Sequence, residues 1–291
     1  MGNLTKRKIT IRFQLAEGSF NGSDDTVEIS GLRCSASINT PGGVSMSTLE
    51  LRVFGMSLDV MNKLTILGKP LVDGRNNTVE LIAGDDINGM SSIYVGTLQE
   101  AWVDTRAAPQ VAFIATAFTG MVAALRPVAP TSYKGTVDAA TIVGEIARQA
   151  GFGFENSGVS VQIADAYHPG TYLAQLQDVA RAGNFNCVID KNVVAIWPAN
   201  ANRRGNVPII SPESGLIGYP MRTQNGIEVK TLFNPTIIFG GQFEVRSLLT
   251  PANGMWTVNN VTHEIESETP GGKWFTTIGG NILGQETAIV G

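Results

Sequence analysis

The stretch that decides the fold lies near the end of the chain, where residues 234–247 read NPTIIFGGQFEVRS and residues 255–280 read MWTVNNVTHEIESETPGGKWFTTIGG. Apolar and polar residues alternate over much of it, and Gly-Gly and Pro-Gly-Gly interrupt the alternation. This pattern predicts several strands joined by tight turns. The stretch holds no cluster of nucleophiles, bases or metal ligands, which favours a component of a larger assembly over an enzyme.

Within this stretch, the strand predicted at residues 255–266 changes phase at Asn259-Asn260. Trp256 and Val258 fall in one phase, and the apolar residues after Asn260 fall in the other. An extra residue in one strand resets register in this way, so the pattern predicts a β-bulge. Further strands are predicted at residues 209–210, 227–229, 236–239, 242–246 and 273–278.

The beginning of the chain shows the same alternation of apolar and polar residues. Residues 8–15, KITIRFQL, alternate as a half-buried strand does. Ser57 is a good N-cap for a short helix that runs to Leu67 and stops at Gly68. Gly96 suggests a bend or bulge in a long strand. Further strands are predicted at residues 27–29, 34–38, 49–53, 78–83, 92–104 and 110–119.

The texture changes after residues 126–130, RPVAP, whose two prolines mark a boundary. A compact helix-helix-hairpin module is predicted next, with helices at 137–150 and 172–182 and strands at 185–190 and 193–197. Thr171 is the expected N-cap of the second helix, and Gly183 the expected left-handed C-cap. Lys191-Asn192 reads as a two-residue hairpin loop.

These changes of texture divide the chain into three parts. A first β domain with a short helix is expected at residues 1–130, an inserted α/β module at 131–200, and a second β domain at 201–291. Residues 278–291 read as a tail that is ordered only when a partner holds it.

The composition limits the possible functions. Charged residues make up 16% of the chain, against roughly 25% in an ordinary soluble domain. Burial against other subunits explains so little charge, although a large monomeric β-protein with a Ser/Thr/Asn-rich surface is an alternative. The net charge of −4 and the lack of a long basic block argue against tight nucleic-acid binding. No apolar run is long enough to insert into a membrane.

The sequence predicts no catalytic, cofactor-binding or metal-binding residues. His168 lies in a turn and His263 in a strand, without a nucleophile or carboxylate at motif spacing. Cys34 and Cys187 lie far apart and read as small buried hydrophobic residues in a reducing compartment. A zinc site would need all four of these residues, with no local pair at the usual spacing.

Two weaker signals have ordinary structural explanations. Residues 85–89, DDING, have a faint calcium-loop look, but position twelve is Gly96 where an EF-hand has Glu, so a polar turn is favoured. The four tryptophans fall in predicted strands and favour core or subunit-interface packing over a sugar-binding platform. They are Trp102, Trp197, Trp256 and Trp274.

Three segments carry a resemblance to a known family. One is Ala83-Gly84-Asp85 followed by Val95-Gly96-Thr97-Leu98; the second is residues 171–198, a helix, a Gly stop and a hairpin ending at a proline. The third is the closing region, with Gly241–Phe243, Trp256–His263 and Gly271-Gly272. In order and texture, residues 8–280 resemble the central hub proteins of phage tails and baseplates, the late-control-protein-D-like (gp27-like) family.

The resemblance implies a fold and a role. The fold class would be mainly β (α+β), with two tube-type β-barrel domains and the inserted helix-helix-hairpin module. Three chains would form a homotrimeric ring that joins the sixfold tail tube to the threefold central spike and lines part of the DNA channel. Its partners would be the tube protein, the spike, other baseplate or tail-tip proteins and the tape-measure protein. Acidic residues in the lumen would keep passing DNA from binding.

The resemblance also implies a structural virion protein without enzymatic activity or cofactors, assembled in the host cytoplasm. The chain is short, with no fused spike or lysozyme domain, so puncturing or cell-wall degradation is not expected of it. Two other functions remain open. One is a carbohydrate- or cell-wall-binding β-protein of a tail tip, and the other is a hydrolase whose site assembles from distant residues.

Overall fold

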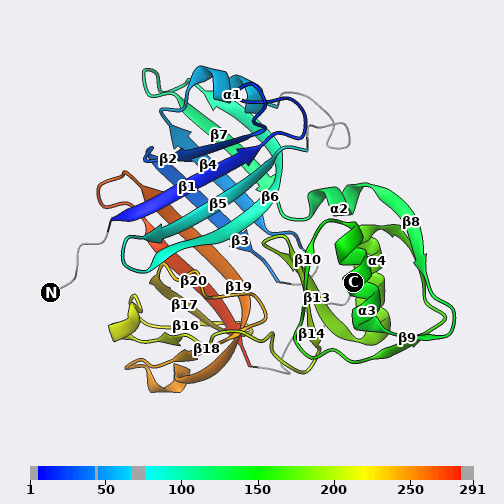
Figure 1. Cartoon of the computed structure of the whole chain (residues 1–291). Coiled ribbons are helices and arrows are strands. Elements are labelled where there is room, and N and C mark those ends of the chain that lie inside the picture. Colours follow the sequence, from blue (N-terminus) through cyan, green and yellow to red (C-terminus); the bar gives the residue numbers. More distant parts are fainter. Residues whose placement is uncertain (1–5, 43–44, 67–75, 283–291) are drawn as a thin grey trace. The chain divides into compact units, whose positions relative to one another are not determined.

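The computed structural model describes residues 6–42, 45–66 and 76–282, and the chain divides into two compact units (Figure 1). Unit 1 consists of Met1–Asn39, Met46–Val122 and His263–Trp274. Unit 2 consists of Thr40–Ser45, Ala123–Thr262 and Phe275–Gly291. Strands predominate in the described residues, so the predicted mainly β fold class is confirmed. No helix in these ranges has the length and apolarity needed to cross a bilayer.

Unit 1 is built on a sheet with strand order β19-β3-β4-β7-β6-β5-β1-β2. These strands lie where the alternation of apolar residues predicts them. Their bounds are β1 (Arg7–Gln14), β2 (Thr26–Ser30), β3 (Cys34–Thr40), β4 (Thr48–Phe54), β5 (Thr78–Asp85), β6 (Gly89–Asp104) and β7 (Ala112–Phe118), with the end of β19 (Gly254–Ser267).

The core of unit 1 consists of the side chains on one face of each strand, which belong to every second residue. β1 pairs with β5 so that Ile11 lies opposite Leu81 and Phe13 opposite Val79, and all four side chains are buried. Phe13 also contacts Phe113 of β7 edge to face, with ring centroids 6.0 Å apart. The polar residues of β1 alternate with this set, as predicted for a half-buried strand.

α1 (Leu58–Leu64) begins after Ser57, whose side chain accepts a hydrogen bond from the first turn, so the predicted N-cap is confirmed. The helix does not reach the predicted end at Leu67. Thr65 takes an extended backbone conformation and ends the helix. Its backbone N–H and its hydroxyl both donate to the Met61 carbonyl in the last turn. The predicted stop at Gly68 lies outside the described residues.

β6 contains two register shifts, and neither is at Gly96. Pairing with β5 passes over Ile93, and pairing with β7 passes over Gln99. The predicted position of the bulge is therefore wrong. Gly96 is required for a different reason, because a Cβ there would lie 2.4 Å from the Tyr94 hydroxyl oxygen and 2.8 Å from its ring.

The first part of unit 2 is the helix-helix-hairpin module. Figure 1 shows α3 and α4 packed side by side near β13 and β14. Its elements are α2 (Met121–Leu125), which begins at the unit boundary, β8 (Pro127–Ser132), β9 (Thr136–Asp138), α3 (Ala139–Gln149), β10 (Gly153–Asn156), β11 (Gln162–Ala164), β12 (Tyr167–Thr171), α4 (Tyr172–Gly183), β13 (Phe185–Asp190) and β14 (Val193–Pro198). The short strands β8 to β12 were not recognised in the sequence, because runs of three to six residues show too little periodicity.

Three small sheets surround the two helices of the module. β10 and β13 flank β14, while β9 pairs with β11 and β8 with β12. β8 contains the two prolines that predicted a boundary. The buried core under the helices includes Ile142 and Ile146 of α3 and Leu176 and Val179 of α4.

Most cap residues of α3 and α4 are of the types that cap helices in sequence-based predictions. Asp138 and Thr171 accept hydrogen bonds as N-caps, the second as predicted. The prediction for the C-terminal end of α4 is wrong by one residue, because Gly183 is still helical and Asn184 takes the left-handed conformation with φ of 50°. Gly183 is needed for space, since a Cβ there would lie 2.5 Å from the Phe185 ring.

The predicted hairpin between β13 and β14 is confirmed. Asp190 pairs with Val193, which leaves Lys191 and Asn192 as the loop. Their φ angles are 48° and 65°, the left-handed values that a two-residue type I′ turn requires.

The rest of unit 2 is a second β region. β16 (Met221–Thr223), β17 (Gly226–Leu232), β20 (Trp274–Asn281) and β19 follow one another in the sheet. β18 (Gln242–Val245) pairs with β19, and β15 (Ile209–Ile210) pairs in parallel with β18. The core of this region includes Val229, Phe243, Val258 and Ile278.

Two predictions for this region are wrong. Residues 236–239 form turns and loop, because the Asn234 side chain accepts from the Thr236 backbone N–H, and Gly240 then reverses the chain with φ of 77°. The strand β20 continues through Asn281, so the expected tail does not begin at Ile278. The remainder of the expected tail, from residue 283, lies outside the described residues.

The change of phase at Asn259-Asn260 is present in the structure. Val258 and Val261 are both buried, while Asn260 between them is exposed. Gly279 of β20 accommodates the change, because a Cβ there would lie 2.4 Å from the Asn259 side-chain oxygen. The bulge itself stays a prediction.

Candidate interaction surfaces

The two histidines and the two cysteines are divided between the units. His263 and Cys34 belong to unit 1, and His168 and Cys187 to unit 2. Among the described residues, no three His, Cys, Asp or Glu side chains are grouped as a metal site requires. Burial raises the pKa of each thiol to about 12, and for Cys34 the nearby Glu266 carboxylate adds to the shift. Both cysteines are free.

The prediction that His168 lies in a turn is wrong, because it lies in the strand β12, where it is 6% exposed. Its Nδ1 is 3.6 Å from an Asp178 carboxylate oxygen, and neither ring nitrogen has a hydrogen-bond partner in the described chain. The neighbouring Thr131 hydroxyl donates to Gln175 at 2.6 Å, so it is not aligned with the imidazole as a nucleophile. This cluster holds α4 on the β8–β12 pair.

The Asp85–Gly89 segment is the polar turn that the sequence favours. The Asp85 carboxylate accepts from the backbone N–H groups of Ile87 and Asn88 and from the Asn88 side chain. These hydrogen bonds, chiefly those from Asn88, lower the pKa of Asp85. The carboxylate that a calcium ion would need is therefore used to close the β5–β6 turn.

The tryptophans mostly pack, as predicted. Trp274 is buried beneath Arg7, and Trp197 contacts Phe239 with ring centroids 5.9 Å apart. Trp256 donates from its indole nitrogen to the Ala252 carbonyl at 2.9 Å. Trp102 differs, because it lines a trough in unit 1.

This trough has a volume of about 520 Å³ and lies on the polar face of β3, β4, β6, β7 and the end of β19. Its charged side chains are largely paired. Lys273 contacts Glu264 at 2.5 Å, and Arg52 lies 3.7 Å from Asp104. Hydrogen bonds from Arg106 lower the pKa of Asp104 to about 2. The trough is thus a polar surface whose charges are already balanced.

Unit 2 exposes four large apolar side chains on β15, on β19 and in the loop after β18, and these four residues are called its apolar face: Ile209, Met255, Leu248 and Leu249. Ile209 and Met255 flank Glu244 across β15, β18 and β19 and are 41% and 48% exposed. Leu248 is 80% exposed. Large exposed apolar side chains are typical of protein-contact surfaces.

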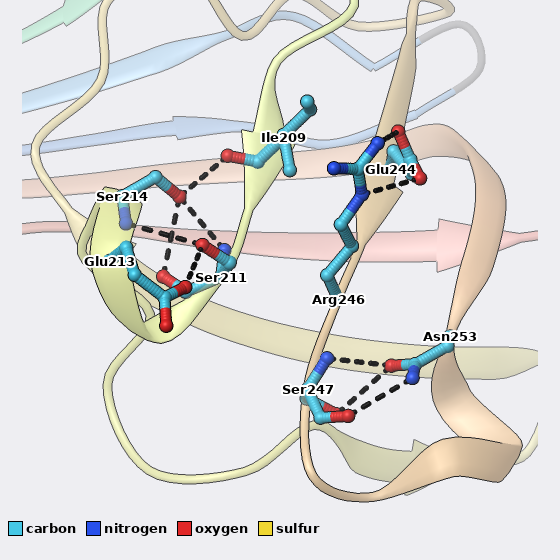
Figure 2. A network of polar contacts seen from close by, with 8 residues as sticks. All are labelled: Ile209, Ser211, Glu213, Ser214, Glu244, Arg246, Ser247 and Asn253. Carbon is cyan, nitrogen blue, oxygen red and sulfur yellow. Dashed lines mark hydrogen bonds and ion pairs between the residues drawn. The ribbon is translucent and has the colours of Figure 1, made fainter.

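Hydrogen bonds between Ser247 and Asn253 join the two ends of the loop at residues 247–253 (Figure 2). The Asn253 side chain accepts from the Ser247 N–H at 2.6 Å and donates to the Ser247 carbonyl at 3.0 Å. The Arg246 guanidinium donates two hydrogen bonds, of 2.7 and 2.9 Å, to the Glu244 carboxylate. A loop whose ends are joined in this way loses less conformational entropy when it binds a partner.

The edge of β15 is closed to further strands. The Ser214 hydroxyl donates to the Ile209 carbonyl at 2.6 Å and accepts from the Ser211 N–H at 2.8 Å (Figure 2). Ser211 in turn caps the Pro212–Ser214 turn. The Ile209 carbonyl at this edge is therefore already used within the chain.

Two other edges are open. β2 ends the strand order of unit 1 and pairs with β1 alone, and β16 ends that of unit 2 and pairs with β17 alone. In the described part of the chain, no backbone–backbone hydrogen bond outside these two pairings involves β2 or β16. Open strand edges recruit strands from other chains unless they are protected.

A sheet-built chain with open edges and exposed apolar side chains offers surfaces for contact with other subunits. The chain belongs to the baseplate hub gp41 family, whose model matches residues 26–278. It is therefore a structural protein of phage tails and baseplates.

Solved structures show the same fold at low sequence identity. A tail protein of Neisseria meningitidis MC58 has a TM-score of 0.60 at 6% identity, over 93% of this chain and 95% of that one. The 43 kDa tail protein of prophage MuSo2 from Shewanella oneidensis gives 0.60 at 7%, with the same coverage.

A third similar structure comes from a secretion system. The E. coli c3393 protein, described as a type VI secretion component similar to T4 tail proteins gp27 and gp5, gives a TM-score of 0.53 at 9% identity. The alignment covers 86% of this chain and 73% of that one. Among curated proteins, none matches the chain by sequence.

Proposed function

We propose that this protein is the hub that joins the sixfold tail tube to the threefold central spike, as a homotrimer that forms part of the DNA channel. The observation that carries the proposal is the family match, which extends from residue 26 to residue 278 and so includes both units. The protein would assemble in the host cytoplasm and remain in the virion tail.

Three parts of the chain would have separate roles. Residues 1–130 and 201–291 would form two tube-type β-barrel domains, so that three chains place six similar domains around the channel. Residues 131–200 would form the inserted helix-helix-hairpin module. The open edges of β2 and β16 and the apolar face of unit 2 supply surfaces for such contacts.

The proposed role needs no catalysis, and the titratable groups support that. The thiols of Cys34 and Cys187 have pKa values raised to about 12, which leaves little thiolate at neutral pH. His168 is buried beneath α4, away from solvent and substrate.

The charge distribution supports a channel that does not retain DNA. Unit 1 contains 15 acidic and 11 basic residues, a net charge of −4, whereas unit 2 contains 10 of each. An acidic lumen formed by unit 1 repels phosphates. A lumen with a positive electrostatic potential would contradict this part of the proposal.

Immunogold electron microscopy tests the location. Antibodies against the folded protein should label tails of the encoding phage at the junction of tube and spike. Label along the tube, on the fibres or on the capsid would overturn the proposed position.

Trp102 favours one second candidate function, binding of a glycan at a tail tip. It lines the trough together with Glu50 and Arg52, and aromatic rings and polar groups in a cleft suit such ligands. Saturation-transfer NMR with cell-wall glycan fragments should show contacts that Trp102→Ala removes if this function exists. No transfer of saturation from the wild-type protein to any fragment would exclude it.

A further inference from the structure

We propose that neighbouring copies of the chain join by pairing β16 of one copy with the open edge of β2 of the next. This inference rests on the proposed homotrimer and specifies its contact. The contact would be a backbone ladder between two different edges, so every copy would use each edge once.

The geometry of β2 shows which groups are free to pair. The Leu15 N–H donates to the Asp25 carbonyl, and the β1–β2 register continues through Phe13 with Val27. Bonded and non-bonded pairs alternate in an antiparallel ladder. Thr26 and Glu28 therefore turn their backbone N–H and C=O groups away from β1, toward the open edge.

β16 offers a short exposed edge of three residues, which can pair along part of the five-residue β2. All three of its residues are exposed, and Met221 is 59% exposed. Tyr219, just before the strand, is 62% exposed. On β2, the side chains of Val27 and Ile29 are half-buried and apolar. Met221 and Tyr219 of the next copy can cover these two side chains.

The charges of the two edges are opposite. Asp24 and Glu28 give the β2 edge two exposed carboxylates, and Arg222 is the exposed cation of β16. Within the described residues, no ion pair involves Arg222 or Asp24, whereas Glu28 contacts Arg12 at 3.1 Å. Opposite charges on facing strands stabilise pairing and help to fix register.

A contact between two different edges is compatible with the ring of three copies proposed above. A contact between two different surfaces repeats from copy to copy and ends in a ring when the rotation closes. The edge of β15 cannot compete, because Ser214 already occupies its outer carbonyl.

The first test blocks the β2 ladder without removing the fold. Glu28→Pro deletes an outward N–H, which an edge strand tolerates, and Glu28→Ala is the matched control for the lost side chain. In sedimentation analysis of the full chain, Glu28→Pro should weaken trimer formation at least about ten-fold relative to Glu28→Ala. Equal association of the two variants, with equal circular dichroism spectra, would overturn the proposed contact while leaving the trimer intact.

The second test exchanges charges across the contact. Glu28→Lys and Arg222→Glu should each weaken the trimer, and the double variant should recover most of the association. Failure of the double variant to recover, with both single variants folded, would also overturn the pairing of these edges. A wild-type chain that stays monomeric at every concentration would contradict the proposed trimer and this contact together.

Discussion

At the scale of single residues, Arg203 connects distant parts of unit 2. Its guanidinium donates to both carboxylate oxygens of Glu155 at 3.0 and 2.8 Å and to Asp190 at 2.9 Å. Arg203 is 7% exposed, so removing it leaves two carboxylates without their shared cation. Breaking such a buried network costs about 3 kcal/mol or more.

We therefore predict that Arg203→Met lowers the free energy of unfolding by about 3 kcal/mol. The exposed neighbour Arg204 offers a control, and Arg204→Met should change stability by no more than about 0.5 kcal/mol. Urea unfolding followed by circular dichroism measures both. Equal effects of the two substitutions would show that the network contributes little.

The same network predicts a pH dependence. Hydrogen bonds from Arg203 lower the pKa of Glu155 from its ordinary 4.5. A carboxyl group with a lowered pKa in the folded state stabilises fully above the unfolded pKa and loses its contribution as pH falls through the folded value. Wild-type protein should therefore lose more stability than Glu155→Gln below about pH 4.5, in urea titrations at matched pH. Parallel losses would contradict this role.

Sequence reasoning found the local residue roles and missed the distant ones. Ser57 and Thr171 were predictable as N-caps because a cap and its partner lie within one turn. The partners of Arg203 lie 48 and 13 positions away, and nothing local indicates them. Gly96 was singled out for the wrong reason, because its contact with Tyr94 depends on how the strand coils.

At the scale of elements, the end of α4 depends on Asn184. Its left-handed backbone, with φ of 50°, suits Asn or Gly and costs other residues about 1 kcal/mol. We predict that Asn184→Ala lowers stability by about 1 kcal/mol, while Asn184→Gly is nearly neutral. Thermal unfolding by circular dichroism compares the two, and an Ala variant as stable as the Gly variant would refute the cap.

Long elements were predictable and short ones were not. Helices of eleven and twelve residues and strands such as β1 and β19 show a clear period. Residues 236–239 looked like a strand because they are apolar, but the Asx turn at Asn234 and the chain reversal at Gly240 prevent it. β20 extends past its predicted end because Gly279 and Gly280 fit close to Asn259 and Phe243.

At the scale of the whole molecule, the composition and the open edges both favour contact with other subunits. A chain with 16% charged residues, unprotected edges at β2 and β16 and an apolar face is suited to burial among other subunits. The sequence predicted the mainly β class and the hub family, but not which edges stay open, since that depends on strand order.

The apolar face gives a further prediction at this scale. Leu248→Ser should leave thermal stability almost unchanged, because the side chain is 80% exposed. It should reduce incorporation of the protein into tails at least about ten-fold if Leu248 is a contact hot spot. Leu58→Ser in α1, at a side chain that is 65% exposed, is the control. Normal incorporation of Leu248→Ser would exclude this face as a contact.

The mass of the full-length protein in solution tests the central claim most directly. Sedimentation equilibrium over a wide concentration range should give a species of three times the 30.9 kDa chain mass. A single species at the mass of one chain, or one at twice that mass, would contradict a trimeric hub.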